Sequence, residues 1–385
     1  MPDPVPAASS VPAPASPTGT APYDALLLVS FGGPEKPADV LPFLENVTRG
    51  RGIPRERLAD VAHHYDGFGG RSPINDQCRA LLAALRTELD TRGIDLPLYW
   101  GNRNWDPYLG EEVARVVADG HRRVLAILTS AYPSYSSCRQ YRENLFDAFD
   151  PQSASGVGVD KIRHYADHPG FVEASVDATL ASLEELGAAG EQARLVFVTH
   201  SIPTAMATTA GPTPRSAEGG YVDWHLDVAT AVARGVAERL GRTHAFDLVY
   251  CSRSGPPSQP WLEPDVNDHL RALHADGVGG VVLVPIGFIS DHMEVIYDLD
   301  TEAVETAQEL GLPLARAATA GTHPAFVAGL VDLVLERAAA ARGEEPDRPV
   351  VEGGVVGWYD CAPDCCTNLR DPERRALCQR AAQPA

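Results

Sequence analysis

Two stretches of the sequence decide the expected fold: LLLVSFGGP at 26–34 and LVFVTHSIP at 195–203. Each is a continuously apolar run that ends in a turn containing proline. Such runs are typical of parallel strands that are covered on both faces. Because the two stretches end in similar turns and lie far apart in the chain, the sequence predicts that one α/β unit occurs twice.

The rest of the chain alternates apolar runs with helix-period segments. Five apolar residues of one expected helix share a stripe: Cys78, Leu81, Leu82, Leu85 and Leu89. Strand–helix alternation indicates an α/β fold of two doubly wound, Rossmann-like halves with parallel sheets and a cleft between them. Strands are expected at 25–31, 96–101, 123–129, 194–199, 246–251 and 280–288, and helices at 76–90, 171–186, 225–240 and 323–341.

The chain has 385 residues, which is enough for two domains of ordinary size. We expect an N-terminal half at 22–188 and a C-terminal half at 189–344, joined by a linker near 187–191. Residues 1–21 hold six prolines among small polar residues and are predicted to be a disordered tail. A polar, cysteine-bearing tail is expected at 345–385.

Charge and composition exclude several classes of function. The formal net charge is −20, and so acidic a surface repels nucleic acid. Lys36 and Lys161 are the only lysines, and no P-loop motif occurs. The sequence has no apolar run of transmembrane length, and the N-terminus lacks the features of a Sec signal peptide. We therefore expect a cytoplasmic protein, and the acidic surface predicts a monomer.

His200 stands at the end of an expected buried strand, where Ser-Ile-Pro follows it. A histidine in this position can point into a cleft and act as a base near neutral pH. It can equally be a hydrogen-bonded core histidine. Its position alone does not choose between the two interpretations.

The segment IGFISDHMEVIYDLDTE carries an acidic row in which Glu294, Asp298 and Glu302 follow one another at intervals of four residues. This spacing places them on one face of a helix, where their mutual repulsion would be relieved by a bound cation. Asp291 and His292 lie at the expected start of that helix. However, Asp291 and Glu294 also resemble a helix-capping pattern. From spacing alone, capping is the favoured interpretation.

Three loops could bind an anion or a ring: TRGRG at 48–52, FGGRSPI at 68–74 and SRSGPPSQPWLEPDV at 252–266. Arg49 in the first could pair with a carboxylate. Ser72 in the second offers a hydroxyl group, and Trp261 in the third is expected in a cleft wall. Each loop can also be read as an ordinary surface turn.

Four cysteines crowd into the C-terminal tail, and a fifth lies in the mid-chain loop AYPSYSSCRQY. A polar tail has no core to bury thiols, so ligation of Zn²⁺ or an iron–sulfur cluster explains them better. An exposed redox pair or a disordered tail is the alternative. The five candidates are Cys361, Cys365, Cys366, Cys378 and Cys138.

Taken together, the segments LLLVSFGGPE, FGGRSPIN, THSIP, SRSGPPSQPWLEPDV and PIGFISDHMEVIYDLD resemble the ferrochelatase family, in the family's order. The resemblance covers about residues 23–342. It implies a chelatase-like fold and the insertion of Fe²⁺ into a porphyrin in haem biosynthesis.

The resemblance also assigns roles to residues. It implies that His200 and Glu294 are catalytic, and that His292, Asp298 and Glu302 form a path for iron. We expect the imidazole and the acidic row to face each other across a gap wide enough for a flat tetrapyrrole. Porphyrin contacts are expected from Phe31, Arg49, Ser72, Tyr141 and Trp261.

The cysteine-bearing tail resembles that of Gram-positive members of the family that carry a [2Fe–2S] cluster. This resemblance implies coproporphyrin III as the porphyrin and Fe²⁺ as the metal substrate. The alternatives are a protoporphyrin IX ferrochelatase, a Co²⁺ or Ni²⁺ chelatase, and a non-catalytic tetrapyrrole-binding redox sensor. The implied cluster ligands are Cys138, Cys361, Cys365 and Cys366, with Cys378 as a substitute for Cys365 or Cys366.

Overall fold

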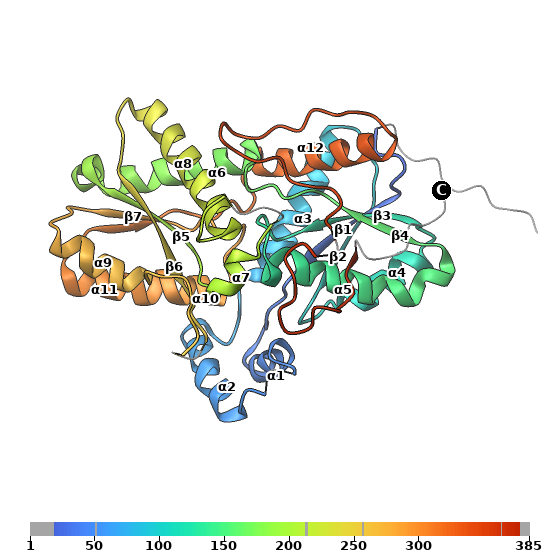
Figure 1. The fold of residues 1–385 in the computed structure, drawn as a ribbon, viewed down its shortest axis with the longest axis horizontal. Coiled ribbons are helices and arrows are strands. Elements are labelled where there is room, and N and C mark those ends of the chain that lie inside the picture. The colour runs from blue at the N-terminus through green and yellow to red at the C-terminus, as the bar shows by residue number, and fades with distance from the viewer. Residues whose placement is uncertain (1–18, 51, 212–214, 256–257, 363, 378–385) are drawn as a thin grey trace, which may run out of the picture.

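Two four-stranded parallel sheets form the framework of the chain in a computed structural model (Figure 1). The strand order is β2-β1-β3-β4 in the first sheet and β6-β5-β7-β8 in the second, so the second sheet repeats the order of the first. The structure describes residues 19–50, 52–211, 215–255, 258–362 and 364–377. The strands are β1 Ala25–Ser30, β2 Leu98–Asn102, β3 Arg123–Leu128, β4 Gly158–Lys161, β5 Arg194–His200, β6 Phe246–Cys251, β7 Val281–Val284 and β8 Leu314–Arg316.

Helices cover both faces of each sheet, as the sequence predicted for doubly wound halves. The α-helices are α1 Pro37–Val47, α2 Arg55–Ala62, α3 Ile74–Thr91, α4 Leu109–Ala118, α5 Gln140–Phe149, α6 Pro169–Glu185, α7 Thr204–Thr208, α8 Gly220–Leu240, α9 Val266–Ala275, α10 Met293–Val295, α11 Ala303–Leu310 and α12 Pro324–Ala341. Between them lie the 3₁₀-helices η1 His63–Phe68, η3 Asp150–Ser155 and η4 Gly187–Gln192, and the π-helices η2 Tyr135–Arg139 and η5 Ile296–Glu302.

β1 illustrates why the apolar runs become central strands. All six of its residues are buried. Leu26 and Leu28 belong to the core on one face of the sheet, and Leu27 and Val29 belong to the core on the other. Each such side chain stabilises the fold by about 1.5–3 kcal/mol. A strand that is buried on both faces must be apolar at consecutive positions.

The predicted stripe on α3 is confirmed, because Cys78, Leu81, Leu85 and Leu89 are buried against the sheet. The last long helix, α12, packs against both α3 and α6. One core cluster therefore runs through residues of both predicted halves. The division at residue 188 stays a prediction.

Two expectations about strands were wrong. The strand expected at 280–288 ends at Val284, because Pro285 follows and proline has no backbone N–H to donate to a neighbouring strand. β4 and β8 were not predicted. β4 contains Asp160 and Lys161, and β8 is only three residues long, so neither has the apolar run of a buried strand.

The chain after α12 returns across the first sheet to lie beside α5 (Figure 1). Arg139 donates a hydrogen bond to the Arg374 carbonyl oxygen at 2.7 Å. Residues 1–18 of the predicted N-terminal tail lie outside the described residues. Within the described ranges, none of the helices has both the length and the apolarity needed to span a bilayer.

Candidate functional site

His200 is the last residue of β5, at the carboxyl edge of the second sheet. β5 lies between β6 and β7, where successive connections diverge, and α/β sheets bind ligands at such points. His200 Nδ1 lies 2.5 Å from the Ser201 carbonyl oxygen. A carbonyl oxygen can only accept, so Nδ1 carries the hydrogen and Nε2 is left to exchange protons.

Glu294 approaches that free nitrogen. Its Oε2 lies 3.7 Å from His200 Nε2, and the side chains are 31% and 60% exposed. Burial alone would lower the pKa of His200, but the Glu294 carboxylate, the Ser201 carbonyl oxygen and Asp298 together raise it. When the imidazole is protonated, the two side chains form an ion pair at the edge of solvent.

The gap expected between the imidazole and the acidic row was wrong. At 3.7 Å, His200 and Glu294 are in contact, and no ring fits between them. The two groups must instead face the same side of any bound macrocycle. Their contact depends on how α10 packs against the end of β5, and residue spacing carries no information on that packing.

Behind Glu294 the acidic row continues along η5, which holds Asp298 and Glu302. The Ser252 hydroxyl donates a hydrogen bond to Asp298 Oδ2. Burial raises the pKa of Asp298 to about 6, with the charges of Glu294 and Glu302 adding to the rise and Ser252 opposing it. Burial also raises the pKa of Glu302, and Asp265 contributes. Asp298 and Glu302 therefore take up and release protons at higher pH than isolated carboxylates do.

His292 precedes α10 at its N-cap position, and no side-chain hydrogen bond caps the helix there. The ring stacks edge-on against Phe288 with centroids 5.3 Å apart. Burial lowers the pKa of His292, which keeps the ring neutral beside His200. Its place next to Glu294 is consistent with the predicted role on the iron path, which stays a prediction.

Three of the porphyrin contacts expected from the N-terminal half lie in separate loops, and the fourth, Tyr141, lies on α5. Arg103 bridges two of them, since its guanidinium lies 5.4 Å from the centre of the Phe31 ring and 4.6 Å from that of Tyr141. Ser72 donates its backbone N–H to the Pro34 carbonyl oxygen at 2.9 Å. Arg49 is exposed and donates to Asn46 Oδ1 at 2.5 Å.

Exposure separates these residues into two groups. Ser72 is 3% exposed and Tyr141 is 5% exposed, and the Tyr141 hydroxyl pairs with Thr129 Oγ1 at 3.2 Å. Phe31 is half-buried and Arg49 is exposed. Phe31 and Arg49 are accessible to solvent, whereas Ser72 and Tyr141 are buried. Contact of any of the four with a porphyrin stays a prediction.

Trp261, expected in a cleft wall, forms an antiparallel bridge with Pro203, three residues after His200. Its indole packs closely on Gly255, where an added Cβ would meet Nε1 at 2.1 Å. Only glycine fits at 255, because any larger residue would collide with the Trp261 indole.

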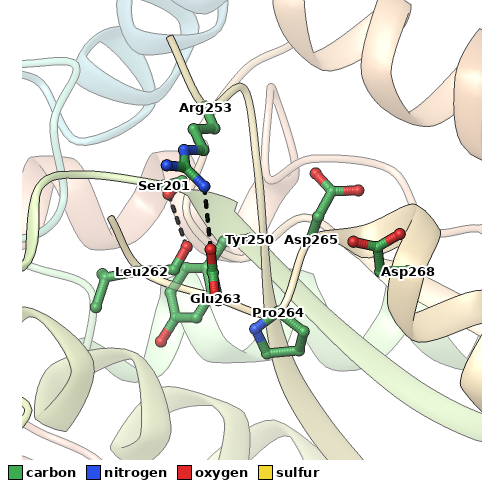
Figure 2. A pocket seen from close by; sticks show the side chains of 8 residues that line it. All are labelled: Ser201, Tyr250, Arg253, Leu262, Glu263, Pro264, Asp265 and Asp268. Atoms are coloured by element: carbon green, nitrogen blue, oxygen red, sulfur yellow. Dashed lines mark hydrogen bonds and ion pairs between the residues drawn. The ribbon is translucent and has the colours of Figure 1, made fainter. Parts of the chain in front are cut away.

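A pocket of about 380 Å³ lies beside this loop (Figure 2). Among its lining residues, the Ser201 hydroxyl donates a hydrogen bond to the Leu262 carbonyl oxygen at 2.8 Å, and Arg253 forms an ion pair with Glu263 at 3.0 Å. Neither His200 nor Glu294 lines it. The pocket therefore flanks the predicted catalytic pair and does not contain it.

The cysteines form a second site on the first half. Cys138 on η2 and Cys361, Cys365 and Cys366 of the C-terminal segment make one buried cluster of thiols. Cys365 Sγ and Cys366 Sγ are 3.9 Å apart. Hydrogen bonds from Cys138 and Cys365, together with the charge of Lys161, hold the pKa of Cys361 far below its usual range. A thiolate is the form that binds metal. Cys378 lies outside the described residues.

Sequence reasoning missed several neighbours of these sites. They are polar residues whose partners are distant in sequence: Arg103, Tyr221, Ser252, Lys161 and His164. The Tyr221 hydroxyl, for example, donates to the His200 carbonyl oxygen at 3.0 Å. The sequence did hold a signal for Lys161, because it is one of only two lysines in the chain. In the structure this lysine is buried, with 3% exposure.

Comparison with known proteins identifies the family of the chain. The ferrochelatase family model matches residues 23–338. The chain belongs to the ferrochelatase family. It is 56% identical over 360 residues to the coproporphyrin III ferrochelatase of Streptomyces coelicolor, covering 92% of this chain and 96% of that one. This ferrochelatase-family chain is also 55% identical to the coproporphyrin III ferrochelatase of Streptomyces griseus, with the same coverage. The identity to the corresponding enzyme of Leifsonia xyli is 51%, over 90% of this chain and 92% of that one.

Proposed function

We propose that this chain inserts Fe²⁺ into coproporphyrin III and releases two protons. The observation that carries the proposal is the contact between His200 Nε2 and Glu294 Oε2 at the carboxyl edge of the second sheet. Metal insertion requires a base for the pyrrole protons and oxygen ligands for a hard cation, and both stand here side by side. The named relatives, which match almost the whole chain, support the same reaction.

The reaction exchanges one metal ion for two protons. Each pyrrole N–H gives its proton to a base, and Fe²⁺ takes the four nitrogen lone pairs as ligands. His200 Nε2 would accept a proton, and Glu294 would pass it to Asp298 and Glu302. Because the pKa of Asp298 is raised to about 6, this carboxylate can hold and release protons near the pH at which the imidazole does. Carboxylates freed of protons would then hold incoming Fe²⁺.

Removal of the Ser252 hydroxyl should move the acid limb of the pH–rate profile upward. Ser252 holds the pKa of Asp298 down, so Ser252→Gly is expected to raise it further. Insertion should then need a higher pH to reach half of its maximum rate. The backbone of Ser252 has φ +60°, which glycine adopts readily, so the variant should fold. Initial rates between pH 5 and pH 9 measure the shift.

The control is Ser254→Gly, which removes an exposed hydroxyl two residues away. Its profile should coincide with that of the wild type. A Ser252→Gly profile that also coincides, or that moves to lower pH, would remove Asp298 from the rate-limiting protonation.

The substrate proposal rests on charge. Coproporphyrin III carries four propionates and protoporphyrin IX carries two, so a site with more cationic partners favours the former. Arg49 is exposed and would supply such a partner, and hydrogen bonds through Asn46 and Asn104 connect it to the backbone of Phe31. We expect kcat/KM for coproporphyrin III to exceed that for protoporphyrin IX by at least about tenfold, which corresponds to roughly one charge-assisted hydrogen bond. Arg49→Gln should raise KM for coproporphyrin III by about tenfold and leave kcat nearly unchanged.

Arg55→Gln is the matched control, because Arg55 is an exposed arginine on α2 that pairs with Glu45. Steady-state rates with both porphyrins and with Fe²⁺, Co²⁺ and Ni²⁺ test the whole proposal. Faster insertion into protoporphyrin IX, or a preference for Co²⁺ or Ni²⁺, would contradict the substrate. Porphyrin binding without turnover would contradict the reaction itself.

We further propose that Cys138, Cys361, Cys365 and Cys366 hold a [2Fe–2S] cluster. Four buried thiols fit the four ligands of such a cluster, and a backbone N–H from Gly211 donates to Cys366 Sγ at 3.2 Å. When bound, the cluster would supply a one-electron redox centre. It would also tie the C-terminal segment to η2. A cytoplasmic location and a monomeric state stay predictions.

A further inference from the structure

His164 stands among the cluster cysteines without a role in the metal site proposed above. It is 3% exposed, and one atom each from Cys138, His164 and Cys361 lie within 4.8 Å of one another. Its Nε2 is buried beside the thiols of Cys138 and Cys361, and no other polar group of the described residues pairs with it. A buried nitrogen without a well-aligned partner destabilises the fold. A cluster held by these thiols would place sulfur atoms next to this nitrogen.

The ring and the backbone of His164 are both packed. Trp224 meets the ring edge-on, with centroids 6.2 Å apart. The tail packs against the backbone at Gly357, where an added Cβ would lie 3.0 Å from the His164 carbonyl oxygen. These contacts limit the positions open to the imidazole, which suits an outer hydrogen-bond donor to a metal site.

The surroundings suit a negatively charged group. Lys161 is buried beside the same thiols and donates to the Trp358 carbonyl oxygen at 3.3 Å. A [2Fe–2S] cluster on four thiolates carries net negative charge, and hydrogen bonds to its sulfur atoms are one of the means by which proteins set its potential. Four cysteines already complete the ligand set, so the imidazole is not needed as a ligand.

We propose that His164 donates a hydrogen bond to a sulfur atom of the cluster and thereby raises its reduction potential. This inference rests on the cluster proposed above. A neutral imidazole and a charged one both carry an N–H, so the bond does not require a particular protonation state. More negative charge accumulates on sulfur when the cluster gains an electron, so the bond favours the reduced form.

The test is a redox titration of the full-length chain, followed by visible absorbance and electron paramagnetic resonance. His164→Leu should keep the absorbance spectrum of a four-cysteine cluster. Its one-electron reduction constant should fall about tenfold, which corresponds to a potential lower by about 59 mV. His164→Gln keeps an N–H donor, so its reduction constant should fall by less than that of His164→Leu. His244→Leu, at a buried histidine bonded to the Ala193 carbonyl oxygen, should not change the potential.

Pulsed measurements on the reduced wild type add a readout that does not depend on any variant. A weak ¹⁴N coupling is expected for a hydrogen-bonded imidazole, so its detection supports the proposal even if His164→Leu fails to assemble a cluster. A strong ¹⁴N coupling would mean direct ligation and overturn it, as would an unchanged potential in His164→Leu. A wild type without the cluster spectrum would overturn the cluster proposal as well, whereas an unchanged potential would overturn this inference alone.

Discussion

Replacement of His200 by alanine is expected to lower kcat for iron insertion by about 10²–10⁴-fold, the usual contribution of a general base. His200 Nε2 lies 3.7 Å from the Glu294 carboxylate, in the position of a proton acceptor. Binding of coproporphyrin III should change little, because we propose that other residues bind the propionates and the ring faces. Stopped-flow insertion rates and fluorescence quenching of the porphyrin measure the two effects separately.

His274→Ala is the matched control, because His274 is an exposed histidine near the end of α9. It should retain the wild-type rate. Turnover within a few-fold of wild type in His200→Ala would take the imidazole out of the chemistry. A loss of porphyrin binding equal to the loss of rate would instead give His200 a role in binding.

Replacement of Cys361 by serine is expected to abolish the visible absorbance of the [2Fe–2S] cluster that we propose. Cys361 contacts both Cys138 and Cys365, so it links the mid-chain ligand to the tail. Without the cluster, the three remaining buried thiols would have no metal to bind, and buried Lys161 would lose the negative charge beside it. The C-terminal segment would also lose its link to η2. We expect a lower unfolding temperature and faster proteolysis of residues after α12. Absorbance, iron content and limited proteolysis measure these effects.

Cys78→Ser is the matched control, because Cys78 is also buried but belongs to the α3 stripe and contacts Ser30. It should lose some stability and keep its full cluster absorbance. Equal absorbance in Cys361→Ser and the wild type would show that the thiol is not a ligand.

The sequence predicted the two sheets because a strand that is buried on both faces has apolar residues at consecutive positions. β1 and β5 are apolar at nearly every position, and the turns after them contain proline or glycine. The same logic failed for β4 and β8, which are short or polar. It also misplaced the end of β7, since the apolar pattern continues past Pro285, where the ladder stops.

The candidate site divides in the same way. The interval of four residues between Glu294, Asp298 and Glu302 predicted a shared face. The segment from Ile296 is a π-helix, and Asp298 still lies close enough to Glu294 and Glu302 for their charges to raise its pKa. The contact of Glu294 with His200 could not be predicted, because it depends on packing between elements far apart in sequence. His164 was missed for the same reason, since its neighbours Cys138 and Cys361 come from two separate segments.

The repeated strand order places different side chains at equivalent positions of the two sheets. Phe31 directly follows β1, and His200 is the last residue of β5, the central strand at the equivalent position in the second sheet. One copy of the unit thus ends its central strand beside an aromatic side chain, and the other ends it in an imidazole. Because the two side chains belong to separate sheets, a substitution at either edge leaves the hydrogen-bonded strands of the other sheet unchanged.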